Sequence, residues 1–198
     1  EYSTIVIGAF GLPRIKSFSV TGESSIAFSA SGVPGAAIGV GAAADSNIIR
    51  IGRGGGAVAT NVRVGVSALQ NNTTGSENIA IGSALVSNTT GSLNIAMGAA
   101  LGSNQSGDSN FAFGRLALNL NVSGSGNIAM GVNALANNTV SDNLALGNAA
   151  LTFNTTGASN LAIGASALNL NVIGNSNLAI GYFALRANTA DNNLGIGL

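Results

Sequence analysis

The chain has 198 residues, a formal net charge of zero, and neither cysteine nor histidine. Only 7% of its residues are charged, against roughly 25% in ordinary soluble domains. The lack of cysteine excludes disulfides and thiolate metal sites, and the balanced charge gives no electrostatic basis for binding nucleic acid. No run of 18 or more apolar residues occurs, so we expect no insertion into a membrane.

Residues 1–36 fit the repeat pattern of the later chain least well. The stretches STIVIG (3–8) and SSIAFS (24–29) are similar to a strand of that repeat, but Pro13 and Pro34 would interrupt a strand ladder. We therefore predict a capping or connecting segment here, not a second domain. Because the sequence begins at Glu1 without a signal peptide, we expect a mature product or a fragment.

Residues 37–66 carry glycines at intervals of 13, at Gly39, Gly52 and Gly65, which predicts short coils of a solenoid. Gly39 to Ala44 also matches the GxGxxA dinucleotide-binding pattern. That pattern binds a cofactor only where a strand precedes it and a helix follows it. Here a second strand-like segment, NIIRIG, follows within a few residues. We therefore interpret the glycines as a solenoid corner.

A five-residue segment of the form NIAIG recurs nine times at intervals of 16 or 17 residues, from Asn61 to the end of the chain. Repetition at a short fixed period is typical of a solenoid, in which each unit buries its apolar face only against its neighbours. The one-residue differences between repeats fall between two conserved segments. Since strands in a shared ladder do not tolerate insertions, whereas turns do, we predict coils of two strands and two corners over residues 67–198.

The alternation within the first strand predicts that Ile79 and Ile81 point into the core while Ala80 points outward. The second strand is predicted to place Leu85 and its equivalents inward, joined in some coils by Leu120, Phe153 or Leu170. The predicted core comprises Ile79, Ile81, Leu85, Ile95, Leu101, Phe111, Phe113, Leu118, Ile128, Leu135, Leu144, Leu161, Ile163, Leu168, Leu178 and Ile180.

Two columns of residues are expected to stack at equivalent positions of successive coils. A file of small outward residues would let another chain approach closely, so we predict interchain packing through Ala80, Ala96, Ala112, Ala129, Ala145, Ala162 and Ala179. Stacked asparagine amides can hydrogen-bond along the axis. We predict such a ladder through Asn78, Asn94, Asn110, Asn127, Asn143, Asn160 and Asn177.

The segment AAIGVGAAADSNIIRIGRGGGAVA resembles the head repeat of trimeric autotransporter adhesins of the YadA-like type. The later NIAIGxxALxxNTTGS units are similar to repeats of phage and algal-virus tail fibres. The resemblance covers roughly 37–198 and implies a left-handed β-roll of three parallel chains that serves as an adhesin head or fibre shaft. These coils are longer than the adhesin-head unit, so both alternatives stay open.

Few residue types suited to catalysis are available. The acids Asp45, Glu77, Asp108, Asp142 and Asp191 fall in corners. Glu77 and Asp108 would lie two coils, or about 10 Å, apart, so glycoside hydrolysis of the tailspike type would require carboxylates from two different chains. Arg50 and Arg63 take the alanine position of successive coils, where we expect them to face water, carboxylates or an anion. We expect no catalytic residue, no cofactor and no metal ion.

The sequence thus predicts an all-β fold, a β-solenoid or β-roll of 13- to 17-residue two-strand coils, assembled as a parallel homotrimer. The predicted role is a non-enzymatic structural or adhesive fibre segment on a cell or virion surface, with a host-surface glycan or protein as a further partner. The alternative is a self-assembling extracellular filament subunit that stacks end to end. A glycan- or ice-binding solenoid has less support, because only some corners carry Thr-Thr.

Overall fold

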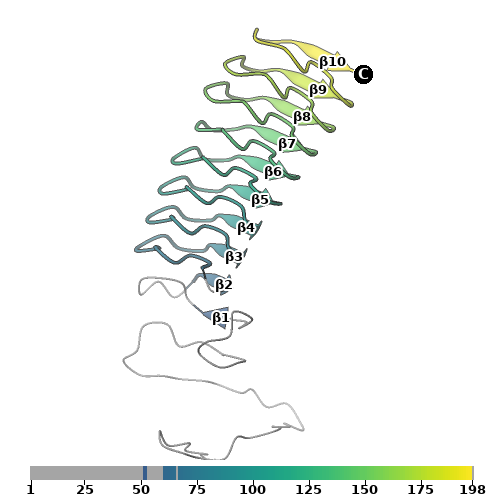
Figure 1. Cartoon of the computed structure of the whole chain (residues 1–198). Helices are drawn as coiled ribbons and strands as arrows, with labels where there is room; N and C mark the ends of the chain where they lie inside the picture. Colours follow the sequence, from purple (N-terminus) through teal and green to yellow (C-terminus); the bar gives the residue numbers. More distant parts are fainter. Residues whose placement is uncertain (1–50, 53–59, 66, 198) are drawn as a thin grey trace, which may run out of the picture.

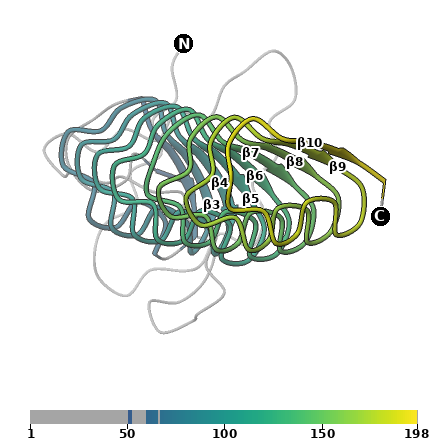
Figure 2. The same ribbon diagram turned by 90° about the horizontal axis from the view of Figure 1, so that it is seen from above.

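The structure is a computed structural model, and it describes residues 51–52, 60–65 and 67–197. It is an all-β, parallel solenoid of about eight turns, whose coils stack along one axis (Figure 1) and follow one another with a similar outline (Figure 2). The strands are β1 (Ile51–Gly52), β2 (Val62–Val64), β3 (Ile79–Gly82), β4 (Ile95–Gly98), β5 (Phe111–Phe113), β6 (Ile128–Met130), β7 (Leu144–Leu146), β8 (Leu161–Ile163), β9 (Leu178–Ile180) and β10 (Leu194–Ile196).

All the strands belong to a single sheet in chain order, and from β2 to β10 every neighbouring pair is parallel. Equivalent residues of successive coils face each other, as in the pairs Ile79 with Ile95 and Ala80 with Ala96. The 16- and 17-residue repeat therefore sets the register of the ladder. Strand β1 differs, because it pairs with β2 in the antiparallel direction. Residues 1–36 and most of the predicted short coils lie outside the described residues.

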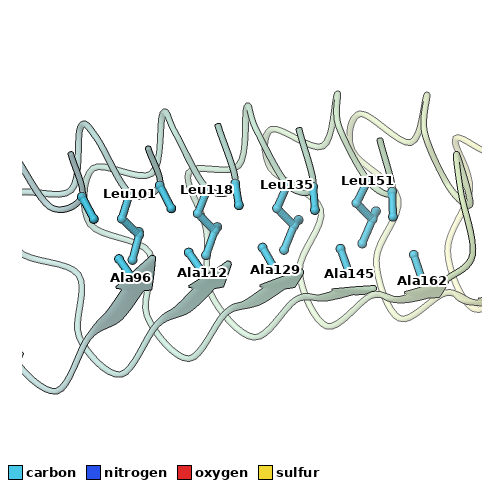
Figure 3. Packing of buried hydrophobic residues seen from close by; sticks show 14 of the residues in the cluster. Ala96, Leu101, Ala112, Leu118, Ala129, Leu135, Ala145, Leu151 and Ala162 are labelled. Atoms are coloured by element: carbon cyan, nitrogen blue, oxygen red, sulfur yellow. The ribbon is translucent and has the colours of Figure 1, made fainter. Parts of the chain in front are cut away.

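The side chains of the strands point the opposite way from the sequence prediction, with the alanines inside and the larger apolar residues outside. The alanines from Ala80 to Ala179 are 0–1% exposed and form the core together with the buried leucines of the opposite run. Figure 3 shows Leu101, Leu118, Leu135 and Leu151 pointing toward the strands that carry these alanines. The predicted outward alanine file is therefore wrong, as is the burial of Ile79, Ile81, Ile95, Phe111, Phe113, Ile128, Leu144, Leu161, Ile163, Leu178 and Ile180, all half-buried or exposed.

The physical reason is the thickness of the coil. A single layer of leucine side chains fills the space between the strand and the opposite run, and only a small strand residue leaves room for it. At Gly195, which pairs with Ala179, an added Cβ would lie 2.5 Å from Cγ of Leu185. A larger residue on this face would therefore displace the leucine layer. The predicted burial of Leu85, Leu101, Leu118, Leu135 and Leu168 is confirmed.

The run that carries these leucines is not a second strand, so each coil contains one strand and not the predicted two. Each leucine of this column has a left-handed backbone, with φ between 48° and 52° from Leu69 to Leu185. That conformation interrupts the extended alternation, and the alanine directly before each leucine is buried as well. Leu120, Phe153 and Leu170 consequently point outward, at 37–47% exposure, against the prediction that they face inward.

A second left-handed column lies directly before the asparagine that opens each coil. It includes Leu93, with φ of 60° and 53% exposure, and its equivalent Gly126, with φ of 67°. A left-handed backbone costs a residue with a Cβ about 1–2 kcal/mol, but glycine almost nothing.

We therefore expect Leu93→Gly to raise the free energy of unfolding by about 0.5–1 kcal/mol, after the greater flexibility of glycine in the unfolded chain is subtracted. Chemical denaturation measures the change. The matched control is Leu93→Ala, which removes the same exposed side chain but keeps the Cβ. The two variants should differ, and equal stabilities would argue against this backbone strain.

Candidate functional site

The predicted asparagine column lies inside the solenoid, at 0–1% exposure from Asn78 to Asn177. Oδ1 of Asn94 accepts hydrogen bonds from the backbone N–H of Asn110, at 3.0 Å, and from its Nδ2, at 3.1 Å. Nδ2 of Asn110 also donates to the carbonyl of Gly124, at 2.8 Å. The same pattern links Asn127 back to Asn110. Each amide therefore joins its own coil to both neighbours.

The structure contains a second buried asparagine column that the sequence analysis did not assign as a ladder. It runs through Asn72, Asn88, Asn104, Asn121, Asn138, Asn154 and Asn171. Nδ2 of Asn88 donates to Oδ1 of Asn72, at 2.7 Å, and to the carbonyl of Gly91, at 2.9 Å. That carbonyl also accepts from Nδ2 of Asn78, which opens the same coil. The constant Leu-x-x-Asn spacing was the signal that could have identified this column.

The two columns leave little capacity to bind a ligand. Among the described residues, the buried side-chain polar atoms without a hydrogen-bond partner are Oδ1 of Asn121 and Nε of Arg63. The first lies beside the coil that begins at Asn127, where the corner between Asn138 and Asn143 is one residue shorter. The columns are therefore structural, since nearly every amide is already occupied by the protein.

Within the described residues, the outward face of the strands carries an extensive apolar surface. Each strand from β2 to β10 presents two large apolar side chains to the outside, in two parallel columns that we call the apolar strip. The strip consists of Val62, Val64, Ile79, Ile81, Ile95, Met97, Phe111, Phe113, Ile128, Met130, Leu144, Leu146, Leu161, Ile163, Leu178, Ile180, Leu194 and Ile196.

The exposed apolar area of the strip is larger than that of an ordinary protein surface. If each partly exposed side chain contributes on the order of 50 Å², the strip presents roughly 900 Å² of apolar area, compared with about 300–600 Å² for the largest patch of a typical monomer. No charged residue interrupts either column. A flat, uncharged apolar surface of this extent is typical of a protein–protein interface.

Glu77, Asp108, Asp142 and Asp191 belong to different coils, and hydrogen bonds to the backbone occupy two of them, whereas Asp45 lies outside the described residues. Oδ1 of Asp108 accepts from the N–H of Ser92 at 2.7 Å, and Oδ1 of Asp191 accepts from the N–H of Asn175 at 2.6 Å. Asp108 lies one position out of phase with Glu77, whose equivalent is Asp142. Within the described part of the chain, no three His, Cys, Asp or Glu residues are grouped so as to hold a metal ion.

Arg63 pairs with Ala80 and thus occupies the inward-facing alanine position of the first described parallel coil. It is half-buried, and its neighbour in the ladder is Gly52 and not another arginine. The expected stacking on Arg50 lies outside the described residues. Strand β2 is preceded by its antiparallel pairing with β1, so no alanine rung lies on that side of Arg63.

Over the described ranges, no helix has the length and apolarity needed to cross a membrane. No protein-family model, no curated protein and no solved structure matches the chain. The chemistry of the site therefore rests on its own residues: two buried asparagine columns whose amides are nearly all hydrogen-bonded within the fold, and an apolar strip that faces outward over nine strands.

Proposed function

We propose that this chain is a non-enzymatic structural segment of an extracellular or virion-surface fibre, and that it assembles with copies of itself through the apolar strip. The observation that carries the proposal is the extent of the strip, which continues through β2 to β10 without a charged residue. The association replaces the alanine contact predicted from the sequence, because those alanines are buried in the core.

A second copy of the chain is the partner that fits the strip best. The rungs recur at the spacing of one coil, about 4.8 Å for hydrogen-bonded strands. A partner must present apolar side chains at the same spacing over nine strands. Another copy of the chain meets this condition, because it carries the same strip. Burial of roughly 900 Å² on each chain is comparable to the about 800 Å² per partner of a stable interface. A parallel homotrimer of the adhesin-head or tail-fibre type satisfies this geometry.

The corner threonines give less support to a glycan- or ice-binding role. Oγ1 of Thr73 donates to the carbonyl of Thr89 at 2.8 Å, and Oγ1 of Thr139 donates to the carbonyl of Thr155 at 2.8 Å. These hydroxyl donors are thus directed along the solenoid axis and not toward a ligand.

The test is a lysine at the centre of the strip. Ile128 is 37% exposed on β6, between Phe111 and Leu144 of the neighbouring coils. We expect Ile128→Lys to weaken self-association by about 100-fold or more, because an unpaired charge would be buried in the interface, while the fold is retained. Sedimentation equilibrium measures the association and circular dichroism the fold.

The control is Ser123→Lys, an exposed residue outside the strip, which should leave the molecular mass in solution unchanged. A mass of three chains for the unsubstituted protein supports the trimer, and an open series of larger species supports the filament alternative. A protein that stays monomeric at tens of micromolar would overturn the proposal.

A further inference from the structure

A second exposed apolar surface lies on the run opposite the strands, across the leucine layer shown in Figure 3. We call it the far-face patch, and it consists of Leu120, Val122, Phe153, Leu170 and Val172, at 37–47% exposure. Unlike the apolar strip, it is local: the equivalent positions of earlier coils are polar, such as Asn71, Ser87 and Ser103. The repeat itself therefore does not account for this patch, although its area is ordinary for a monomer.

The order of residues along this patch is nearly palindromic. Four successive coils present Leu120 and Val122, then Asn137 and Thr139, then Phe153 and Thr155, and finally Leu170 and Val172. The first and last coils share the identical sequence ALNLNV, at 117–122 and 167–172. Rotation by 180° about an axis midway between the two central coils, parallel to the strands, exchanges the outer pairs with each other. The same rotation places Phe153 of one copy opposite Asn137 of the other.

We propose that the far-face patch is a two-fold, antiparallel contact with a second copy of this chain. In an isologous interface, residue i of one copy meets residue j of the other, and residue j meets residue i. Leu120 would pack on Leu170, and Val122 on Val172, twice in each contact. The palindrome is what selects a second copy, because an unrelated partner has no reason to match it.

The polar residues between the apolar pairs are suited to burial. Nδ2 of Asn137 donates to the carbonyl of Thr152 at 3.0 Å, which holds this half-buried side chain against the backbone beside Phe153. Oγ1 of Thr139 donates to the carbonyl of Thr155, and Oγ1 of Thr155 donates to that of Val172, at 3.1 Å. These donors are already satisfied along the axis, so covering them removes few hydrogen bonds to water.

The contact is smaller than the apolar strip and should be weaker. At the same approximate 50 Å² each, five partly exposed side chains present on the order of 250 Å² per copy, below the about 800 Å² per partner of a standard interface. Where several chains already stand side by side in a fibre, repeated weak contacts of this kind act together and bind one fibre to another. The contact itself uses a different face and is independent of the proposed strip assembly.

Cross-linking between introduced cysteines tests the arrangement, and the native chain contains no cysteine that would interfere. Leu120→Cys and Leu170→Cys are mixed in equal amounts and treated with a thiol cross-linker that spans about 10 Å, the distance between packed sheets. We expect the mixture to form covalent dimers at least several-fold faster than either variant alone. In the two-fold arrangement, like cysteines are displaced by three coils, or about 14 Å along the axis.

The outcomes separate the alternatives. Rapid cross-linking of Leu120→Cys with itself would show a parallel contact and overturn the two-fold arrangement. Cross-linking of the mixture no faster than that of an exposed corner cysteine, Thr74→Cys, would mean that a second copy does not occupy the patch. Adding Ile128→Lys to both cysteine variants should leave the cross-linking in place, so failure of strip assembly and failure of this contact are observed independently.

Discussion

Ala129→Arg is expected to prevent the central coils from folding. Ala129 is 0% exposed on the inner face of β6 and lies between Ala112 and Ala145 in the column of alanines. Arginine would have to displace the leucine layer, which costs about 1–3 kcal/mol by overpacking, and would place an unpaired charge in the core at a further cost of several kcal/mol. We expect a loss of at least about 5 kcal/mol, measured by chemical denaturation and limited proteolysis.

The neighbouring substitution Ile128→Lys is the control for this result, because it introduces a charge one residue away on the outward face of the same strand. It should lower self-association while the circular dichroism spectrum stays unchanged. If Ala129→Arg left thermal stability intact and Ile128→Lys unfolded the protein, the inner and outer faces of the ladder would have to be exchanged.

The second large effect is expected at Asn110. Alanine at this position removes the acceptor of two hydrogen bonds from Asn127, at 3.0 and 3.1 Å, and the donor to Oδ1 of Asn94 and the carbonyl of Gly124. Each buried polar group left without a partner costs about 1–3 kcal/mol. We expect Asn110→Ala to lower the free energy of unfolding by about 3–5 kcal/mol, with the loss of amide protection centred on β5 and β6.

Asn71→Ala is the matched substitution at an exposed position on the run opposite the strands, and it should change stability by less than about 0.5 kcal/mol. Hydrogen exchange followed by mass spectrometry places the effect along the chain. A loss of protection around Asn71 as large as that around Asn110 would show that the buried column has no special part in holding neighbouring coils together.

The sequence was sufficient to predict the solenoid and the phase of its repeat, but not which face of each strand is buried. Alternation shows that Ile79 and Ile81 share one face and that Ala80 lies on the other; it does not show which face is interior. The assumption that the larger apolar residues are buried was wrong, because one row of leucines fills the coil. Asn78 has the same parity as Ala80, and a hydrogen-bonded amide column inside the coil places both residues in the interior.

The backbone conformation of the run opposite the strands could not be predicted from the same pattern. Leucine rarely has a positive φ, so nothing in the Ala-Leu pairs indicated that Leu85 and its equivalents would be left-handed. The stacking of neighbouring coils stabilises that conformation, as in the hydrogen bond from the N–H of Leu85 to the carbonyl of Ala100 at 3.2 Å. Tertiary contacts here override the local preference, which also explains why the outward direction of Leu120 and Phe153 was missed.

The asparagine columns also determine how the length of such a molecule can change. Each coil meets the next through equivalent amide groups, as when Nδ2 of Asn94 donates to Oδ1 of Asn78. Removing or duplicating a whole repeat rejoins equivalent groups, whereas a one-residue change inside a strand would shift every later amide away from its carbonyl. Expansion or loss of repeats in the gene therefore changes the length of the solenoid along its axis in steps of about 4.8 Å, one step for each coil.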